Sequence, residues 1–222
     1  MRLTVYNGSS RGKAGNTEVM LSKVIAGFSS ITDLDLKIIY LSSTKQRQKA
    51  HQSFPQSDLV LLGFPLYTDA MPGLVKEFIE SLAPYVGQDG NPTMSFLVQS
   101  GFPEAHHSRF VECYLEKLAH RLNASYAGTI IKGGGEGVRL MPDSMNRKLF
   151  DGLREAGADL ASDGKFNPEK LKILAKPERY PRILAPLFKL ILKLPFTQSY
   201  WNNQLKKNNA YEMRFARPYN EE

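Results

Sequence analysis

Cysteine is almost absent from this sequence of 222 residues, which contains only Cys113. A single cysteine excludes an internal disulfide and fits a protein of a reducing compartment. The sequence also lacks an apolar run of roughly 20 residues, the length that spans a bilayer. Its first residues show neither the apolar region nor the small-residue cleavage site of a secretory signal. We therefore expect a cytoplasmic protein.

Side-chain patterns that carry catalysis by themselves are missing too. No serine or cysteine has the flanking residues of a nucleophile elbow, and His51 and His120 have no partners at the spacing of metal ligands. We expect His106 and His107 at a solvated helix start, with contact to a substrate as the alternative. Cys113 is expected to be a small core residue. The sequence thus predicts neither a catalytic side chain nor a bound metal.

Excess positive charge is confined to the end of the chain. The formal net charge is +7; up to residue 164 the charges balance, and the whole excess lies in residues 165–222. A basic tail can meet nucleic acid, anionic lipid or an acidic patch on a partner subunit; we expect no nucleic-acid partner. The apolar segment 183–196 is an expected helix. We favour its packing on the core or across a dimer over contact with a membrane surface.

Strand-like and helix-like segments alternate along residues 1–164. Apolar, β-branched runs predict five strands, and apolar residues at helical spacing predict the helices between them. The strands are expected at about 3–6, 34–41, 58–65, 93–99 and 125–132, and the helices at about 17–28, 73–82, 104–122 and 144–162. The segment 42–56 is expected to be a loop or a short helix. This alternation predicts an α/β fold with a parallel sheet, in which 58–65 is the buried central strand.

The loop after the first strand is rich in hydrogen-bond donors and glycine. Positions 7–17 are Asn-Gly-Ser-Ser-Arg-Gly-Lys-Ala-Gly-Asn-Thr. The glycines let the backbone approach a ligand closely, and the following helix directs its free N–H groups and positive dipole end into the same space. The glycine spacing matches neither the nucleotide-triphosphate P-loop nor G-x-G-x-x-G. These features predict a phosphate-binding loop, with an ordinary polar turn as the alternative.

This loop resembles the phosphate loop of the NAD(P)H-dependent FMN reductase family, which includes flavodoxin-like quinone reductases. The family form is Gly-Ser-Pro-Arg, a short variable run, and then Asn-Thr or Ser-Thr. The present sequence has Gly-Ser-Ser-Arg at 8–11 and Asn-Thr at 16–17, so Ser10 replaces the proline. The resemblance assigns the FMN phosphate to a loop that contains Ser9, Arg11, Gly12, Asn16 and Thr17.

Two further loops resemble the family's flavin-ring loops. The loop after the third strand contains Pro65, Leu66, Tyr67, Thr68 and Met71, and the loop after the fourth strand contains Ser100, Gly101 and Phe102. The resemblance places Tyr67 on or beside the flavin ring, with the backbone N–H groups of Tyr67 and Thr68 at its pyrimidine edge; a core position for Tyr67 is the alternative. The glycine-rich segment 133–137 borders the pocket or is a plain loop.

The resemblance implies a fold, an activity and an assembly. The fold is a flavodoxin-like three-layer sandwich with sheet order 2-1-3-4-5 in residues 1–164. The resemblance does not extend to residues 165–222, which composition alone predicts to be a basic helical extension. The activity is that of an enzyme whose FMN takes hydride from NADH or NADPH and reduces a small-molecule acceptor such as a quinone, nitroaromatic, azo compound or metal complex. The assembly is a homodimer. A flavodoxin-type electron carrier without NAD(P)H turnover and a flavin-dependent sensor or membrane-associated partner protein are the alternatives.

Overall fold

A five-stranded parallel sheet organises the first 179 residues in the computed structural model, which describes residues 1–181, 183 and 198–217. The strands are β1 (Arg2–Asn7), β2 (Asp35–Tyr40), β3 (Leu59–Pro65), β4 (Thr93–Gln99) and β5 (Tyr126–Lys132). Their order in the sheet is β2-β1-β3-β4-β5, and all neighbouring pairs are parallel. The predicted sheet and its strand order are confirmed.

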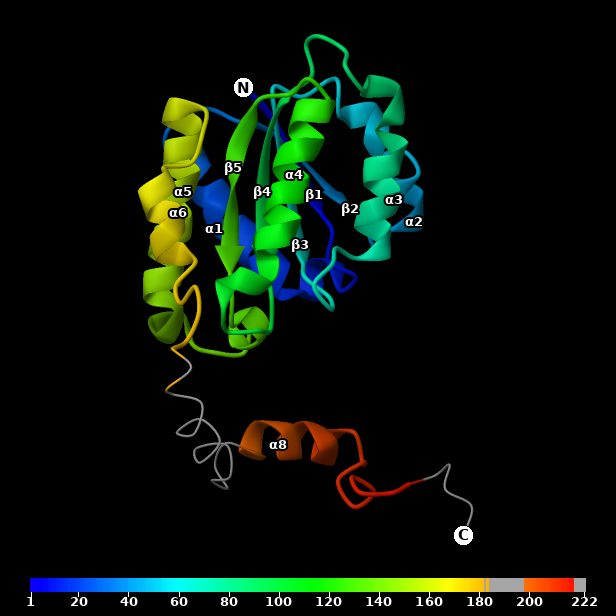
Figure 1. Cartoon of the computed structure of the whole chain (residues 1–222), viewed down its shortest axis with the longest axis vertical. Coiled ribbons are helices and arrows are strands. Elements are labelled where there is room, and N and C mark those ends of the chain that lie inside the picture. The colour runs from blue at the N-terminus through cyan, green and yellow to red at the C-terminus, as the bar shows by residue number, and fades with distance from the viewer. Residues whose placement is uncertain (182, 184–197, 218–222) are drawn as a thin grey trace. The chain divides into compact units, whose positions relative to one another are not determined.

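Helices cover both faces of this sheet (Figure 1). They are α1 (Asn16–Ser29), α2 (Thr44–Arg47), α3 (Gly73–Ser81), α4 (Arg109–Arg121), α5 (Asp143–Asp163) and α6 (Pro168–Leu174). Helices α1, α5 and α6 lie on one face, and α3 and α4 lie on the other with the short α2. The short α2 and the 3-10 turn η2 (Ala50–Ser53) occupy the segment predicted as a loop or short helix. The three-layer sandwich is confirmed.

The central strand β3 is buried along its whole length, as its continuous apolar run predicts. Successive residues of a strand point to opposite faces, so the sheet separates two apolar clusters. Tyr6 and Phe96 belong to the cluster under α3 and α4, whereas Val5 and Leu97 belong to the cluster under α1 and α5. Both faces of the sheet therefore hold the loops at its carboxyl edge in place.

Helices α1 and α5 approach each other at two glycines. A Cβ atom on Gly27 would lie 1.8 Å from the carbonyl oxygen of Arg154, and one on Gly157 would lie 2.0 Å from the carbonyl oxygen of Val24. Such distances leave no room for any side chain at either position. This close packing sets the position of α1, whose first turn lies at the carboxyl end of β1.

Helix α4 begins later than the sequence predicts, and its buried face does not contain Cys113. The 3-10 turn η4 (Ala105–Ser108) precedes it, and its buried positions Val111, Leu115 and Ala119 are four residues apart. Cys113 lies between these positions and is exposed. The prediction of a core cysteine is therefore wrong, because the buried face of α4 excludes position 113.

The compact part of the chain extends past the boundary predicted at residue 164. The two units are Met1–Arg179 and Tyr180–Glu222. An irregularity in the pairing of β4 with β5 lies next to Ala127, whose carbonyl accepts a hydrogen bond from the N–H of Phe166 at 2.9 Å. Phe166 and Leu174 are both buried. Residues 165–179 belong to the first unit because they cover apolar surface of α5 and β5.

The second unit contains the helix α8 (Ser199–Lys207). In the segment after α8, the Arg214 guanidinium lies 4.0 Å from the ring centroid of Tyr211 and 4.8 Å from that of Phe215. Apart from Ile183, the helix expected at 183–196 lies outside the described residues, so the packing of the extension stays a prediction. None of the described helices combines the length and hydropathy that crossing a membrane requires.

Candidate functional site

A cavity of about 120 Å³ lies where β1, β3 and β4 end. Its lining contains Ser9, Arg11, Asn16, Pro65, Leu66, Tyr67, Gln99, Ser100, Gly101 and Glu136. These strands are neighbours in the sheet, so their carboxyl ends bring the three predicted loops together at the point where strand order reverses. The remaining predicted residues do not line the cavity: Gly12, Thr17, Thr68, Met71 and Phe102.

The first turn of α1 faces this region without a side-chain cap. Its N-cap residue is Gly15, which has no side chain to accept the free N–H groups. A Cβ atom on Gly15 would lie 2.6 Å from the Ser9 Oγ, which accepts a hydrogen bond from the Arg11 N–H at 3.3 Å. Uncapped N–H groups and the helix dipole favour an anion at this point.

The side chains of Asn16 and Thr17 connect the loop to other parts of the chain. The Asn16 Nδ2 donates to the carbonyl of Glu136 at 2.9 Å, and its Oδ1 accepts from the N–H of Arg139 at 3.0 Å. The buried Thr17 Oγ1 accepts from the Gln99 Nε2 at 3.4 Å. These contacts join the loops after β1, β4 and β5 around the cavity. A direct contact of Asn16 or Thr17 with phosphate stays a prediction.

A partly buried polar network beneath the loop supports its conformation. The Asn7 side chain accepts from the Ser9 N–H at 2.9 Å and donates to Glu18 at 2.8 Å. The Tyr40 hydroxyl donates to the same carboxylate at 3.0 Å. Desolvation and the contact with Glu18 raise the pKa of Tyr40 to about 12. Sequence reasoning missed Glu18 and Tyr40, because neither belongs to the loop and their meeting depends on strand order.

The loop after β3 forms a tight turn in a conformation that few residues adopt. The Tyr67 N–H donates to the Ala70 carbonyl at 2.8 Å, and the Ala70 N–H donates back at 3.1 Å. Thr68 has φ 48° and Asp69 has φ 61°, a left-handed conformation that costs roughly 1–2 kcal/mol per residue and clusters at functional sites. The N–H of Tyr67 is therefore already paired, contrary to its expected role at a flavin edge. Tyr67 itself is 47% exposed, which excludes the core alternative.

The loop after β4 is held by a hydrogen bond within it and by one from the segment after β5. The Ser100 Oγ donates to the Phe102 carbonyl at 3.0 Å, and the N–H of Gly135 donates to the Ser100 carbonyl at 2.8 Å. The Phe102 ring is 44% exposed and stacks on the His107 ring at 4.4 Å between centroids. Phe102 therefore forms an exposed apolar wall beside the cavity rather than part of its lining.

Sequence reasoning missed two lining residues. Gln99 is the last residue of β4 and is buried. Glu136 belongs to the 3-10 turn η5 (Gly135–Gly137) in the glycine-rich segment after β5. The sequence was compatible with this segment as a border of the pocket or as a plain loop. Because Glu136 lines the cavity, the structure supports a border of the pocket. A larger cavity of about 520 Å³ lies on β2 near Lys37 and Gln52, but it contains none of the predicted site residues.

The sequence itself matches no protein-family model and no curated protein. The solved structures that match the fold include an NAD(P)H:quinone oxidoreductase from Methanothermobacter marburgensis, an FMN-dependent NADH-azoreductase from Bacillus anthracis, and an NADH:FMN oxidoreductase. Their identities to this chain are 14%, 12% and 15%, and their TM-scores are 0.56, 0.56 and 0.55. The alignment with the quinone oxidoreductase covers 72% of this chain and 96% of that chain. The alignment with the azoreductase covers 73% and 100%, and the alignment with the NADH:FMN oxidoreductase covers 79% and 96%, in the same order. This likeness confirms the predicted flavodoxin-like fold.

Proposed function

We propose that this chain is an FMN-dependent oxidoreductase that takes hydride from NADH or NADPH and reduces a small acceptor such as a quinone or a nitro or azo compound. The observation that carries the proposal is the meeting of three predicted loops around one cavity at the switch point of a 2-1-3-4-5 sheet. The solved structures that share the fold bear the names of quinone, azo and FMN reductases, which favours this activity over a flavodoxin-type carrier.

The residues around the cavity fit a bound FMN. The uncapped first turn of α1 supplies N–H donors, and Arg11 is exposed without an ion pair among the described residues. A cavity of about 120 Å³ is smaller than the roughly 300 Å³ at the lower end of ligand pockets. It would enclose only part of the cofactor. The exposed rings of Tyr67 and Phe102 lie in two of the three loops and offer apolar surface for the rest.

Bound FMN would supply the redox chemistry by accepting hydride from the nicotinamide and passing electrons to the acceptor. The protein's own residues bind and orient. Arg11 and the helix N-terminus offset the charge of a phosphate. Tyr67 and Phe102 exclude water from the ring, and Gly101 permits close approach of the backbone. This division of roles requires no nucleophile, in agreement with a sequence that has no nucleophile elbow.

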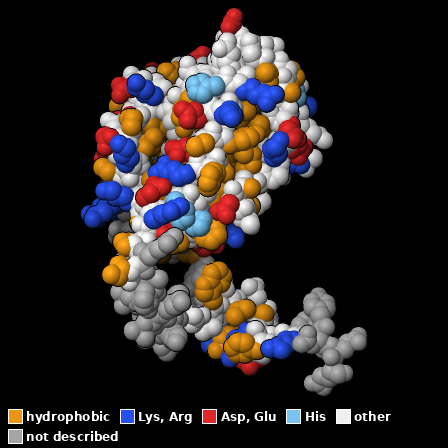
Figure 2. All heavy atoms as spheres, viewed as in Figure 1, with side chains coloured by type: hydrophobic (Ala, Val, Ile, Leu, Met, Phe, Trp, Pro, Cys, Tyr) orange, Lys and Arg blue, Asp and Glu red, His pale blue; other side chains and the backbone are white. Residues whose placement is uncertain are grey.

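We further expect a homodimer. Phe110 is 85% exposed and Tyr114 is 38% exposed on the outer face of α4. A groove of about 270 Å³ runs between α4 and the end of α3, with Leu82 and Leu118 among its apolar residues. Figure 2 shows hydrophobic side chains gathered on this side of the molecule. Exposed apolar surface of this kind favours a protein partner. Light scattering should give twice the chain mass of 25.0 kDa for wild type and a lower mass for Phe110→Glu.

The visible spectrum and its response to nicotinamide test the activity. We expect purified protein, loaded with FMN, to be yellow and to bleach rapidly when NADPH or NADH is added without air. A yellow colour that persists with both donors supports an electron carrier instead. Protein that is colourless and shows no heat of FMN binding in calorimetry refutes both functions.

Two matched variants of the phosphate loop test the site. Arg11→Ala should raise the FMN dissociation constant about 10- to 150-fold, since a hydrogen bond to a charged group contributes roughly 1.5–3 kcal/mol. Lys13→Ala removes the same charge from the same loop, but Lys13 lies 5.4 Å from the Tyr40 ring centroid and does not line the cavity. It should change FMN affinity little. Equal weakening by both variants contradicts a specific role for Arg11.

A further inference from the structure

Three metal-ligating side chains meet in the loop between β4 and α4. Glu104, His106 and His107 each place one ligand atom within 4.8 Å of the other two. The Glu104 Oε2 lies 4.0 Å from the His106 Nδ1, and the two imidazole centroids lie 4.1 Å apart. Ligand atoms around one tetrahedral zinc ion lie roughly 3.3–3.6 Å apart, because each lies about 2.0–2.2 Å from the metal. Small side-chain rotations therefore suffice to close such a shell.

One of these atoms lacks a hydrogen-bond partner. The His106 Nδ1 is buried and has no such partner among the described residues. The carboxylate at 4.0 Å is too distant for a hydrogen bond, and an unpaired buried polar atom costs about 1–3 kcal/mol. A cation bound at the imidazole nitrogen would satisfy it, and the nearby carboxylate would offset the charge of that cation. The unpaired His106 nitrogen is an observation separate from the short distances among the three residues.

Asp69 supports the cluster from the neighbouring loop. The His107 Nδ1 lies 3.3 Å from the Asp69 Oδ1. A metal-bound histidine typically donates its second ring N–H to a carboxylate, which fixes its tautomer and orientation. With Nδ1 directed at Asp69, the Nε2 of His107 is the nitrogen left for a metal.

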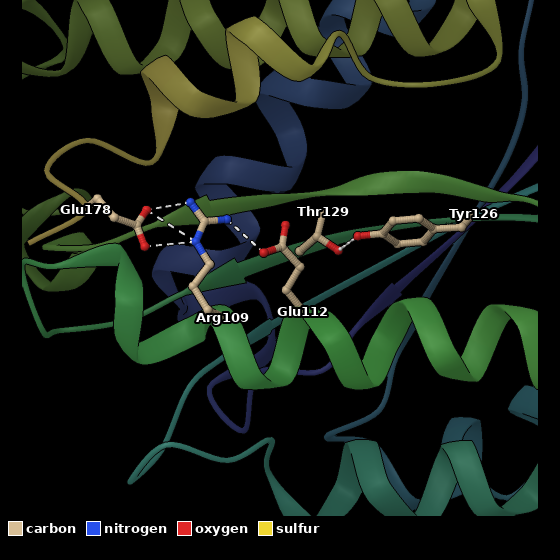
Figure 3. Close-up of polar contacts among 5 residues, drawn as sticks. All are labelled: Arg109, Glu112, Tyr126, Thr129 and Glu178. Carbon is tan, nitrogen blue, oxygen red and sulfur yellow. Dashed lines mark hydrogen bonds and ion pairs between the residues drawn. The ribbon is translucent and has the colours of Figure 1, made fainter.

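The backbone that carries the cluster is held by the segment after α6. The N–H of Ala105 donates to the Pro177 carbonyl at 3.0 Å, and the N–H of His106 donates to the Glu178 carbonyl at 3.2 Å. Figure 3 shows the Arg109 guanidinium against the Glu178 carboxylate, with hydrogen bonds of 2.6–3.2 Å. The hydrogen bond from Arg109 lowers the pKa of Glu178. A constrained backbone favours a site because its ligands need little ordering on binding.

We infer that Glu104, His106 and His107 bind a divalent first-row transition-metal ion, with Asp69 orienting His107. Two imidazoles and one carboxylate suit such ions, and three protein ligands leave a position for water or a small ligand. Histidine side chains lie at the surface near this end of α4 (Figure 2). Because Asp69 follows Tyr67 and His107 stacks on Phe102, a bound ion would tie together two of the loops that meet at the candidate flavin cavity.

Calorimetric titration of the chelator-treated full chain with Zn²⁺, without added flavin, tests this site. We expect wild type to bind one ion per chain. The double variant H106A/H107A should bind at least about 100-fold more weakly. The matched double variant H51A/H120A removes the other two histidines of the chain and should bind as wild type does. Asp69→Asn should weaken binding about 10- to 100-fold, the usual effect of losing a partner of a metal ligand.

Either of two results would overturn the inference: no saturable Zn²⁺ binding by wild type, or equal binding by the two double variants. Circular dichroism establishes whether each variant is folded. If H106A/H107A misfolds, Glu104→Gln and Asp69→Asn decide the question, since each keeps the side-chain size and removes one charge. The titration contains no flavin, so its failure leaves the proposed reductase activity standing. A colourless protein that binds Zn²⁺ would leave the metal site standing.

Discussion

Replacing Gly157 by alanine tests whether the packing of α1 on α5 positions the candidate site. The new Cβ atom would lie 2.0 Å from the Val24 carbonyl oxygen and 2.9 Å from the Phe28 nitrogen. Both are backbone atoms of α1, so no side-chain rotation relieves the clash. The helices must separate by about 1 Å to restore 3.0 Å, a distance below which real Cβ contacts are essentially absent.

The expected loss of stability follows from two opposing effects. Overpacking costs typically about 1–3 kcal/mol, and the upper end applies because the contacted atoms belong to the backbone. Alanine in a helix interior regains about 1 kcal/mol relative to glycine. The net loss in the free energy of unfolding is about 2 kcal/mol, which corresponds to a melting temperature lower by roughly 4–8 °C for a domain of this size. Because α1 begins at the phosphate loop, FMN affinity should fall as well.

Gly152→Ala is the matched control, because Gly152 lies on the same helix α5. Its Cβ atom would meet the end of the Leu174 side chain at 2.8 Å, and that side chain can rotate. Urea unfolding should show Gly152→Ala within about 1 kcal/mol of wild type and Gly157→Ala clearly below it. FMN titration should separate the two variants in the same order. Equal stability of the two variants refutes the reasoning.

The other two predictions concern the Arg109–Glu178 ion pair and the phosphate loop. Glu178→Gln should lower the free energy of unfolding by only about 0.5 kcal/mol, because the Glu178 side chain is 53% exposed and solvent screens the pair. Arg109 lowers the pKa of Glu178 in the folded protein. The stability difference between wild type and Glu178→Gln, measured by urea unfolding, should therefore be complete above the usual glutamate pKa and should vanish as pH falls through the lowered pKa. A stability difference that persists in acid contradicts the prediction. Gly12→Ala places a side chain at φ +52° and should cost about 1–2 kcal/mol in thermal unfolding. A Cβ atom on Gly73 would have open space around it, so Gly73→Ala should not lower the melting temperature. Equal melting temperatures of Gly12→Ala and Gly73→Ala would argue against strain at Gly12.

Local patterns predicted the alternating strands and helices of the fold, and the three predicted loops meet at one edge of the sheet. The continuous apolar run of β3 indicated a strand buried on both faces, and it is buried throughout. Donors and glycines between the first strand and helix predicted a phosphate-binding loop, and this segment does lie at the carboxyl edge of the parallel sheet. Its binding of phosphate stays a prediction. The exposed Tyr67 shows the limit of such patterns. An aromatic residue after a strand fits a core or a ligand wall equally well until the turn geometry is known.

Contacts between distant segments decided the rest. Asn16 bonds to the backbone of Glu136 and Arg139, and His107 meets Asp69 from another loop. The Phe166 N–H donates to the Ala127 carbonyl beside an irregular strand pairing, and the first compact unit extends to Arg179. Periodicity and turn residues are local properties of a chain, so the sequence by itself determined the elements, their layered order and the glycine-rich bend. Only the tertiary structure decided which side chains meet across loops, because that depends on strand neighbours, helix spacing and turn conformation together.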